Sequence, residues 1–302
     1  MFFLKKYKNE ASPFLKWAGG KSQILGEIRQ KYPEGLGVSV TKYAEPFIGG
    51  GAVLFDVLNN YTLKNVYISD INHELINTYI SIRDNVSDLI KILGELESQY
   101  LSKDEEGRKK EYYLNRTRFN ALKAESSDSV ELAALFIALN HTCFNGLYRV
   151  NSKGNFNVPQ GSYKNPKICD RKNLIAVSSA LKDVEIVWGN YKLSKSFIDE
   201  NTFAYFDPPY RPLNSTSNFT SYAQDGFGDK EQIELARFID LMSECGSFII
   251  ASNSDPTNFD PKDDFFDKLY SKHSIKRIDA TRAINSIGVN RGCVRELLIV
   301  TE

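Results

Sequence analysis

The sequence has few of the residues that bind metals or form disulfides. Its 302 residues include four cysteines, widely spaced and without a CxxC pair, and only three histidines. Structural zinc sites need several such ligands at close spacing, so these numbers argue against a zinc site and we expect no metal. Reduced thiols in a cytoplasm are the simpler interpretation of the cysteines.

Long apolar runs and an excess of one charge are also absent. No segment is long and apolar enough to span a membrane, and the start of the chain lacks the apolar core of a signal peptide, so we expect neither. Lys and Arg together number 38, as do Asp and Glu, and the resulting zero net charge argues against a general polycation. Hydrophobic residues at 42% and charged residues at 25% are ordinary for a globular protein.

Short apolar runs that end in Gly or Asp turns alternate with helical patterns over much of the chain. This alternation predicts an α/β fold with a mostly parallel sheet whose faces are covered. The last run, 295–301, is expected to pair with residues 274–278 as an antiparallel edge hairpin. The other predicted strands are residues 40–47, 65–69, 184–188, 203–206 and 247–251, and the predicted helices between them are 52–59, 72–83 and 230–244.

Residues 86–140 break the alternation because they are rich in helical patterns, and a segment rich in Gly and Asn follows them up to Tyr163. This segment predicts a hairpin and loops. We therefore expect residues 76–175 to form an inserted second domain. Residues 141–175 also hold six basic residues against one acid, Asp170, which suits phosphate contacts, although a solvated loop surface is the simpler interpretation from charge alone.

The most informative segment is Asp207-Pro208-Pro209-Tyr210, which directly follows the apolar run 203–206. A carboxylate, two rigid prolines without N–H donors and an aromatic ring therefore leave the carboxyl edge of the predicted sheet together. Such an acceptor-rich, flat-walled pocket suits a planar group that carries an NH2, such as a nucleobase.

Two other strand ends favour a nucleoside cofactor. Phe47 leads into a run of three glycines, 49–51, that opens a predicted helix, and Asp70 ends the next strand. Each feature alone is more simply a tight turn or a helix cap, but the pair has the spacing of a dinucleotide-type site. Trp17 and Lys21 near the amino end could shape a cofactor pocket, although a core Trp beside a surface Lys is the simpler interpretation.

Together these segments resemble the Dam-type DNA adenine-N6 methyltransferases of the D12 class, in the motif order that interrupts the catalytic domain with a target-recognition domain. The resemblance covers about residues 13–300 and includes residues 143–159, which are similar to the family's DNA-reading hairpin; residues 219–222 and 252–254 also look like family segments. It implies a Rossmann-like catalytic domain of residues 1–75 and 176–302, and a mostly helical recognition domain of residues 76–175 that carries a β-hairpin.

The resemblance also assigns residues to roles. Catalysis would fall to Asp207, Pro208, Pro209 and Tyr210. S-adenosylmethionine would be bound by Trp17, Lys21, Phe47, Gly49, Gly51, Asp70, Asn190, Tyr191 and Asp207. Double-stranded DNA would be contacted by Asn145, Leu147, Arg149, Asn151, Pro159 and Tyr222.

Within that set, Arg149 corresponds to a residue that reads a guanine in GATC enzymes, so GATC is the expected site. Ser162 stands where several relatives have Arg, which leaves the sequence preference open. A separately acting restriction endonuclease is a further expected partner. The polar loop 211–230 follows the catalytic turn and is expected to act as a lid or DNA clamp.

The implied reaction explains the residue types. The adenine amine is a poor nucleophile, and the Asp207 carboxylate and the Pro208 carbonyl can accept its two hydrogens while Tyr210 stacks on a base flipped out of the duplex. Two alternatives stay open: a methyltransferase acting on RNA or a protein glutamine amide, and a non-catalytic DNA-binding protein. Related turns that act on RNA or on a glutamine amide begin with Asn, whereas this turn begins with Asp207. Asp207, Asp70 and Lys21 argue against a non-catalytic protein.

Overall fold

The computed structural model describes residues 10–125, 128–211, 227–281 and 293–301. The chain forms two compact units. The helical unit comprises residues 1–19, 50–60 and 72–184, and the sheet unit comprises residues 20–49, 61–71 and 185–302. The predicted division into a catalytic and a recognition domain concerns function and remains a prediction.

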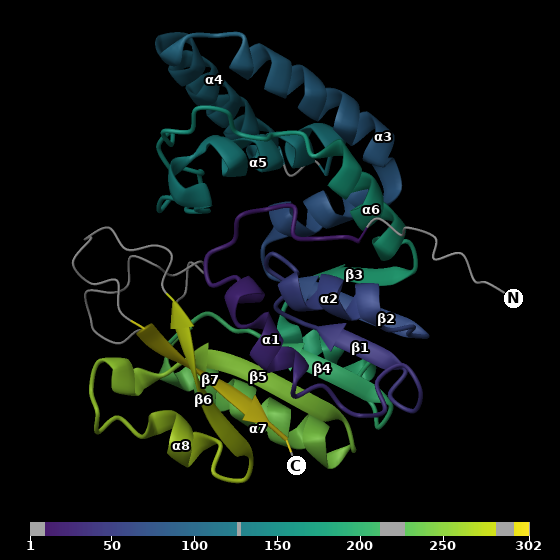
Figure 1. The fold of residues 1–302 in the computed structure, drawn as a ribbon. Helices are drawn as coiled ribbons and strands as arrows, with labels where there is room; N and C mark the ends of the chain where they lie inside the picture. Colours follow the sequence, from purple (N-terminus) through teal and green to yellow (C-terminus); the bar gives the residue numbers. More distant parts are fainter. Residues whose placement is uncertain (1–9, 126–127, 212–226, 282–292, 302) are drawn as a thin grey trace, which may run out of the picture. The chain divides into compact units, whose positions relative to one another are not determined.

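In its described residues, the sheet unit has seven strands in the order β3-β2-β1-β4-β5-β7-β6 (Figure 1). β1 pairs in parallel with β2 and β4, and β4 pairs in parallel with β5. β7 is antiparallel to both β5 and β6. The predicted α/β class and the antiparallel final pair are therefore confirmed. The strands are β1 Lys42–Glu45, β2 Asn65–Asp70, β3 Val184–Trp188, β4 Thr202–Phe206, β5 Phe248–Ser254, β6 Ser274–Thr281 and β7 Cys293–Val300.

The strand order reverses at β1, because β2 follows β1 on one side while β4 lies on its other side. In open α/β sheets ligands bind at the carboxyl ends of the strands beside such a switch point. Phe47 follows β1, Asp70 ends β2 and Asp207 follows β4. The fold therefore brings the ends of these three strands to one edge.

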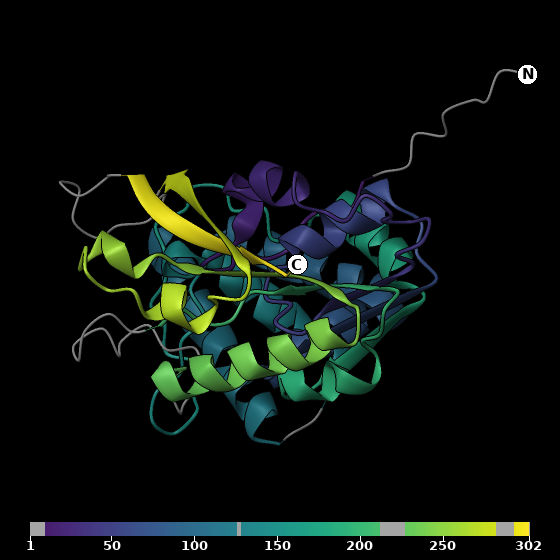
Figure 2. The same cartoon turned by 90° about the horizontal axis from the view of Figure 1, so that it is seen from below.

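Both faces of the sheet are covered by side chains from the same unit. Helix α7 (Asp229–Glu244) is amphipathic, and its buried Leu235 and Ile239 belong to one core with Ala204 and Ile249 of the sheet; Figure 2 shows α7 running along this face. On the other face the ring of Tyr32 lies 5.1 Å from the ring of Phe203. Shorter elements of this unit are η1 (Lys21–Gln23), α1 (Leu25–Arg29), η3 (Tyr191–Ser196), η5 (Pro256–Asn258) and α8 (Phe265–Leu269).

The helical unit contains the two longest helices in the described part of the chain, α3 and α4. α5 is buried along nearly its whole length and packs against both α3 and α4, so it forms the centre of this unit. Side chains of Asn72, Asp104 and Ser129 cap the amino ends of α3, α4 and α5. No helix in the described part of the chain is apolar over a length that would cross a membrane. The elements are α2 (Ala52–Asn60), α3 (His73–Leu101), α4 (Glu105–Ala124), α5 (Val130–Thr142), η2 (Phe144–Gly146) and α6 (Arg171–Leu181).

The predicted hairpin occupies residues 143–160, here called the hairpin segment. It consists of two isolated antiparallel bridges, Cys143 with Gln160 and Val150 with Phe156, rather than continuous strands. Its tip is ordered by Asn151, whose side-chain oxygen accepts hydrogen bonds from the backbone N–H groups of Lys153 and Asn155. Main-chain groups of Phe156 and Val158 are hydrogen-bonded by side chains of α4, as described below, which limits the extent of strand pairing.

Candidate active site

Asp207 is fixed at the end of β4 by two side chains that lie far away in the sequence. Its Oδ1 lies 2.7 Å from the Lys21 ammonium and accepts a hydrogen bond of 2.9 Å from Ser252. Lys21 is only 3% exposed, and the Asp207 side chain is 21% exposed. Burial disfavours the charged form of Lys21, but Asp207, Tyr210 and Glu296 outweigh this effect and raise its pKa above the ordinary value. The ammonium therefore stays charged beside Asp207 at neutral pH.

Tyr210 and Tyr205 extend this network. The hydroxyl of Tyr210 accepts a hydrogen bond of 3.1 Å from Lys21, while 36% of the residue is exposed. Burial raises the pKa of the Tyr210 hydroxyl despite the opposing effect of Lys21. The buried hydroxyl of Tyr205 lies 2.9 Å from Ser252 Oγ. The predicted catalytic turn is thus anchored at Asp207 and at Tyr210, with part of the Tyr210 side chain still accessible.

The two prolines of the turn are held from the side of α7. Gln232 on that helix donates a hydrogen bond of 3.0 Å to the carbonyl of Pro209, and Asn253 donates to Gln232 at 3.2 Å. Gln232 is fully buried, so this contact is shielded from water. Pro208 is buried as well. The turn is rigid because both its backbone and its carboxylate have fixed partners.

A second set of predicted residues gathers at the ends of β1 and β2. The backbone N–H of Gly49 donates to Asp70 Oδ2 at 3.2 Å, with Gly49 in the left-handed region at φ 45°. The ring of Phe47 stacks on Tyr191 at 5.3 Å. Tyr191 itself belongs to the core, and burial raises the pKa of its hydroxyl to about 12. Tyr191 therefore packs against one face of the Phe47 ring and holds it in place.

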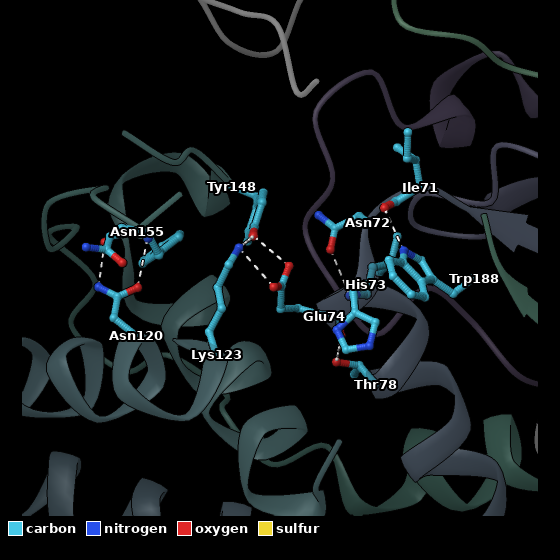
Figure 3. Close-up of polar contacts among 12 residues, drawn as sticks. Ile71, Asn72, His73, Glu74, Thr78, Asn120, Lys123, Tyr148, Asn155 and Trp188 are labelled. Atoms are coloured by element: carbon cyan, nitrogen blue, oxygen red, sulfur yellow. Dashed lines mark hydrogen bonds and ion pairs between the residues drawn. The ribbon is translucent and has the colours of Figure 1, made fainter. Parts of the chain in front are cut away.

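The end of β3 completes this edge of the sheet. The backbone N–H of Gly189 donates to the carbonyl of Asp70 at 3.0 Å, and the indole of Trp188 donates to the carbonyl of Ile71 at 3.0 Å (Figure 3). Asn190 is exposed, and its side-chain oxygen accepts from the backbone of Lys192 at the start of η3. Phe47, Gly49, Asp70, Asn190 and Asp207 thus come from four neighbouring strand ends.

The other two residues predicted to bind the cofactor lie in the helical unit. Trp17 stacks on Tyr148 with ring centroids 6.3 Å apart. Gly51 has φ 72°, and a Cβ placed there would come within 2.6 Å of the Tyr79 hydroxyl, so only glycine fits. A Cβ on the neighbouring Gly50 would touch Trp17 Cβ at 3.0 Å.

The hairpin segment presents most of the residues predicted to contact DNA. Arg149 is exposed, and its Nε donates to the side chain of Asn157 at 2.8 Å. Pro159 is exposed as well, and Asn145 is a non-glycine residue with φ 54°. Leu147 is half-buried and Asn151 orders the tip of the segment as described above. Ser162 is exposed two residues beyond the outer bridge. Tyr222, and the loop 212–226 around it, lie outside the described residues.

A row of side chains on α4 holds the hairpin segment. Tyr112 and Arg116 both donate to the carbonyl of Val158, at 2.7 and 3.2 Å. Asn120, one further turn along, donates to the carbonyl of Phe156 and accepts from its backbone N–H. Residues four apart on a helix share one face, so these three form a single row. We call Tyr112, Arg116 and Asn120 the α4 row.

A buried charged triangle continues the row toward α3. The Glu74 carboxylate lies 2.9 Å from the Lys123 ammonium and accepts a hydrogen bond of 2.8 Å from the Tyr148 hydroxyl (Figure 3). Lys123 also donates to the Tyr148 hydroxyl at 2.9 Å. Burial and the Glu74 charge raise the pKa of Tyr148 well above its ordinary value. Tyr148 directly precedes Arg149, so the triangle fixes the backbone from which Arg149 extends.

Sequence patterns alone did not identify Glu296, Gln232, Glu74 or Lys123. For Glu296 there is a usable signal, because it is an acidic residue at the start of an otherwise apolar strand run, 297–300. The α4 row has only the weak signal of a four-residue spacing. Within the described residues, no group of three or more His, Cys, Asp or Glu side chains is arranged to hold a metal ion.

Known proteins are similar to this chain over nearly its whole length. A family model for the D12 class N6 adenine-specific DNA methyltransferases matches residues 17–284. The type II methyltransferase M.MjaIII of Methanocaldococcus jannaschii is 48% identical over 96% of this chain and 99% of its own length. The type II methyltransferase M1.LlaDCHI of Lactococcus lactis subsp. cremoris is 36% identical over 99% of this chain and 98% of its own length. The DNA adenine methylase of Haemophilus influenzae is 32% identical over 98% of this chain and 95% of its own length.

These relatives align over nearly the whole chain, and the family model includes the strand ends and the hairpin segment described above. The resemblance predicted from the motifs is confirmed. The chain belongs to the D12 class of N6 adenine-specific DNA methyltransferases.

Proposed function

We propose that the chain moves a methyl group from S-adenosylmethionine to N6 of an adenine flipped out of duplex DNA. The observation that carries this proposal is the asymmetry of Asp207. Both Lys21 and Ser252 contact its Oδ1, and within the described residues Oδ2 has no partner. Oδ2 is therefore available to accept one hydrogen of the adenine amine.

The neighbouring groups suit the rest of the reaction. The carbonyl of Pro209 is already bonded to Gln232, so the Pro208 carbonyl is the acceptor for the second amine hydrogen. With both hydrogens held, the nitrogen can pyramidalise and direct its lone pair at the methyl group. The Tyr210 side chain, 36% exposed with its hydroxyl bonded to Lys21, is placed to stack on the flipped base.

The strand ends beside Asp207 fit a nucleoside methyl donor. Asp70 is partly exposed, which suits ribose hydroxyl groups, and the glycine turn at Gly49 allows close backbone approach. Phe47 lines this place, Asn190 is exposed beside it, and Tyr191 supports Phe47. S-adenosylmethionine supplies a sulfonium methyl group when bound, and Lys21 would hold its carboxylate. We assign Trp17 and Gly51 to the same site.

Recognition is assigned to the hairpin segment. Arg149 reads a guanine, and Asn145, Leu147, Asn151 and Pro159 contact the duplex around the flipped base, with Tyr222 as a further contact. Residues 76–175 form the recognition domain, and residues 1–75 and 176–302 form the catalytic domain. GATC is the proposed target, since Arg–guanine pairs in the major groove specify sequence.

We also propose a partner enzyme and a cellular location for this chain, from the names of its relatives. Two relatives are named type II methyltransferases. We place this chain beside a separate restriction endonuclease that cuts the unmethylated sequence, and in the cytoplasm with its DNA substrate. Family membership favours DNA adenine over RNA or a glutamine amide as the methyl acceptor.

The decisive experiment measures transfer of labelled methyl groups to GATC duplexes, altered duplexes, RNA and protein. Wild type should methylate adenine in the GATC duplex, and Asp207→Ala should lose at least about a hundredfold in turnover because the amine loses an acceptor. Near-normal turnover by that variant would overturn the proposal. Arg149→Ala should reduce discrimination between cognate and altered duplexes, whereas equal loss on both would indicate a phosphate contact instead.

A further inference from the structure

Glu296 places a second carboxylate in the catalytic network. It lies in β7, opposite Ser254 of β5 and Ile278 of β6. Its Oε2 is 3.8 Å from the Lys21 ammonium, the same group that contacts Asp207 at 2.7 Å. The side chain is 17% exposed.

This carboxylate is poorly satisfied for a buried charge. Among the described residues, its Oε2 has no hydrogen-bond partner although the atom is buried. Burial raises the pKa of Glu296 above its ordinary value, Lys21 opposes this rise, and the nearby charge of Asp207 adds to it. Buried carboxylates that lack full hydrogen bonding are costly, so a role in the site is a better explanation than stability.

Among the residues that the structure describes, the charges of this cluster do not cancel. Lys21 contributes one positive charge, while Asp207 and Glu296 contribute one negative charge each. Within the described ranges, the other titratable groups that face Glu296 are the hydroxyls of Tyr205 and Tyr210. The neighbouring cations on the strands, Arg277 and Arg295, both contact Asp255 instead.

We propose that Glu296 is a positioning residue for methyl transfer, which holds Lys21 between two carboxylates and leaves the described groups of the site with one negative charge in excess. This inference rests on the proposed function. Lys21 is also bonded to the Tyr210 hydroxyl. Glu296 therefore fixes, through Lys21, both the carboxylate and the aromatic ring of the catalytic turn.

The excess charge matters because positive charge moves during the reaction. The amine lone pair forms the new N–C bond as the electron pair of the S–C bond returns to sulfur, and the amine then loses one proton to Asp207. A carboxylate beside an unopposed ammonium accepts a proton poorly. Glu296 offsets the field of Lys21 at Asp207 and so favours both the cationic donor and the proton transfer.

The test compares Glu296→Gln, Glu296→Asp and the matched control Glu27→Gln. Glu27 pairs with Lys276 at 2.8 Å and its side chain is 42% exposed, so its substitution removes the same charge from the surface of the same unit. Turnover is measured against pH, and calorimetry compares the affinities for S-adenosylmethionine and for S-adenosylhomocysteine, which lacks the sulfonium charge.

In wild type, turnover should fall on the acid side as Glu296 takes up a proton. Glu296→Gln should turn over slowly at every pH, at about the rate that wild type has at low pH. Its turnover should therefore lack the decrease that wild type shows as the pH falls. The Michaelis constant for DNA should be unchanged. Its preference for the cationic donor over the neutral product should fall about tenfold. Glu296→Asp should recover part of the turnover, and Glu27→Gln should behave as wild type.

The role of Glu296 would be overturned if wild type is active and Glu296→Gln has the same pH profile and the same affinity ratio. The proposed function would then remain intact. An inactive wild type on every DNA substrate would instead overturn the proposed function. If Glu296→Gln does not fold, Glu296→Asp decides: full wild-type turnover in this variant, whose shorter side chain cannot hold Lys21 in the same place, contradicts the inference.

Discussion

The side chain of Asn120 pairs with both main-chain polar groups of Phe156. Its amide nitrogen donates to the Phe156 carbonyl at 3.1 Å, and its oxygen accepts from the Phe156 N–H at 2.8 Å. This is the pairing that a neighbouring strand would otherwise supply. Helix α4 therefore acts as a substitute strand for one side of the hairpin segment.

Asn120→Ala should loosen the hairpin segment. We expect the free energy of unfolding to fall by about 1–2 kcal/mol, because two buried main-chain groups lose their partners. Discrimination between cognate and altered duplexes should fall more than turnover on the cognate duplex. Thermal unfolding and methylation of both duplexes check this, with Thr117→Ala on the exposed side of α4 as the control. Full discrimination in a destabilised Asn120→Ala would contradict a positioning role.

Tyr148→Phe tests the charged triangle. It removes the hydroxyl bonded to Glu74 and Lys123 but keeps the ring that stacks on Trp17. We expect a loss of about 2 kcal/mol in the free energy of unfolding, the usual value for a hydrogen bond to a charged group.

Glu74→Gln should be more destabilising, about 3–5 kcal/mol, because it leaves Lys123 without its counter-charge. Denaturant unfolding of both variants measures these losses. Equal losses in the two variants would show that the Lys123 charge does not depend on Glu74.

Ser252→Ala tests how Asp207 is oriented. The substitution removes a donor to Oδ1 and also the partner of the Tyr205 hydroxyl. We expect turnover to fall about tenfold with little change in cofactor affinity, because the carboxylate is misplaced rather than removed. Tyr205→Phe is the matched comparison, since it keeps the bond from Ser252 to Asp207. If both variants lose the same turnover, the effect comes from packing.

His141 should make stability depend on pH. Its Nε2 lies 3.0 Å from the Phe14 carbonyl, and burial lowers its pKa below the ordinary value of 6.5. The unfolded chain therefore binds a proton at a higher pH than the folded chain. Stability contributed by neutral His141 is present above pH 6.5 and is lost as the pH falls toward the lowered value.

Melting temperatures of wild type and His141→Gln between about pH 5 and 8 check this expectation. The wild type should lose stability on the acid side, and the variant should lose less because it has no imidazole to protonate. Parallel curves for the two proteins would assign the acid loss to other groups.

The local features of this protein follow from residues that are close together in the chain. Apolar runs, glycine turns and the Asp207 turn are set by neighbouring residues, so the strands of the sheet, the antiparallel final pair and the family were all predictable. The roles of the predicted site residues remain predictions that the proposed experiments test.

Which distant side chains come into contact depends instead on how the chain folds in three dimensions. Lys21 and Tyr210 are 189 positions apart, and nothing in the periodicity near either one encodes their contact. Their contact, and that of Glu296 with Lys21, depends on the order of β4, β5 and β7 in the sheet. The α4 row likewise depends on the packing of the hairpin segment along that helix. Such contacts are non-local, because strand order and helix packing place residues that sequence spacing does not relate.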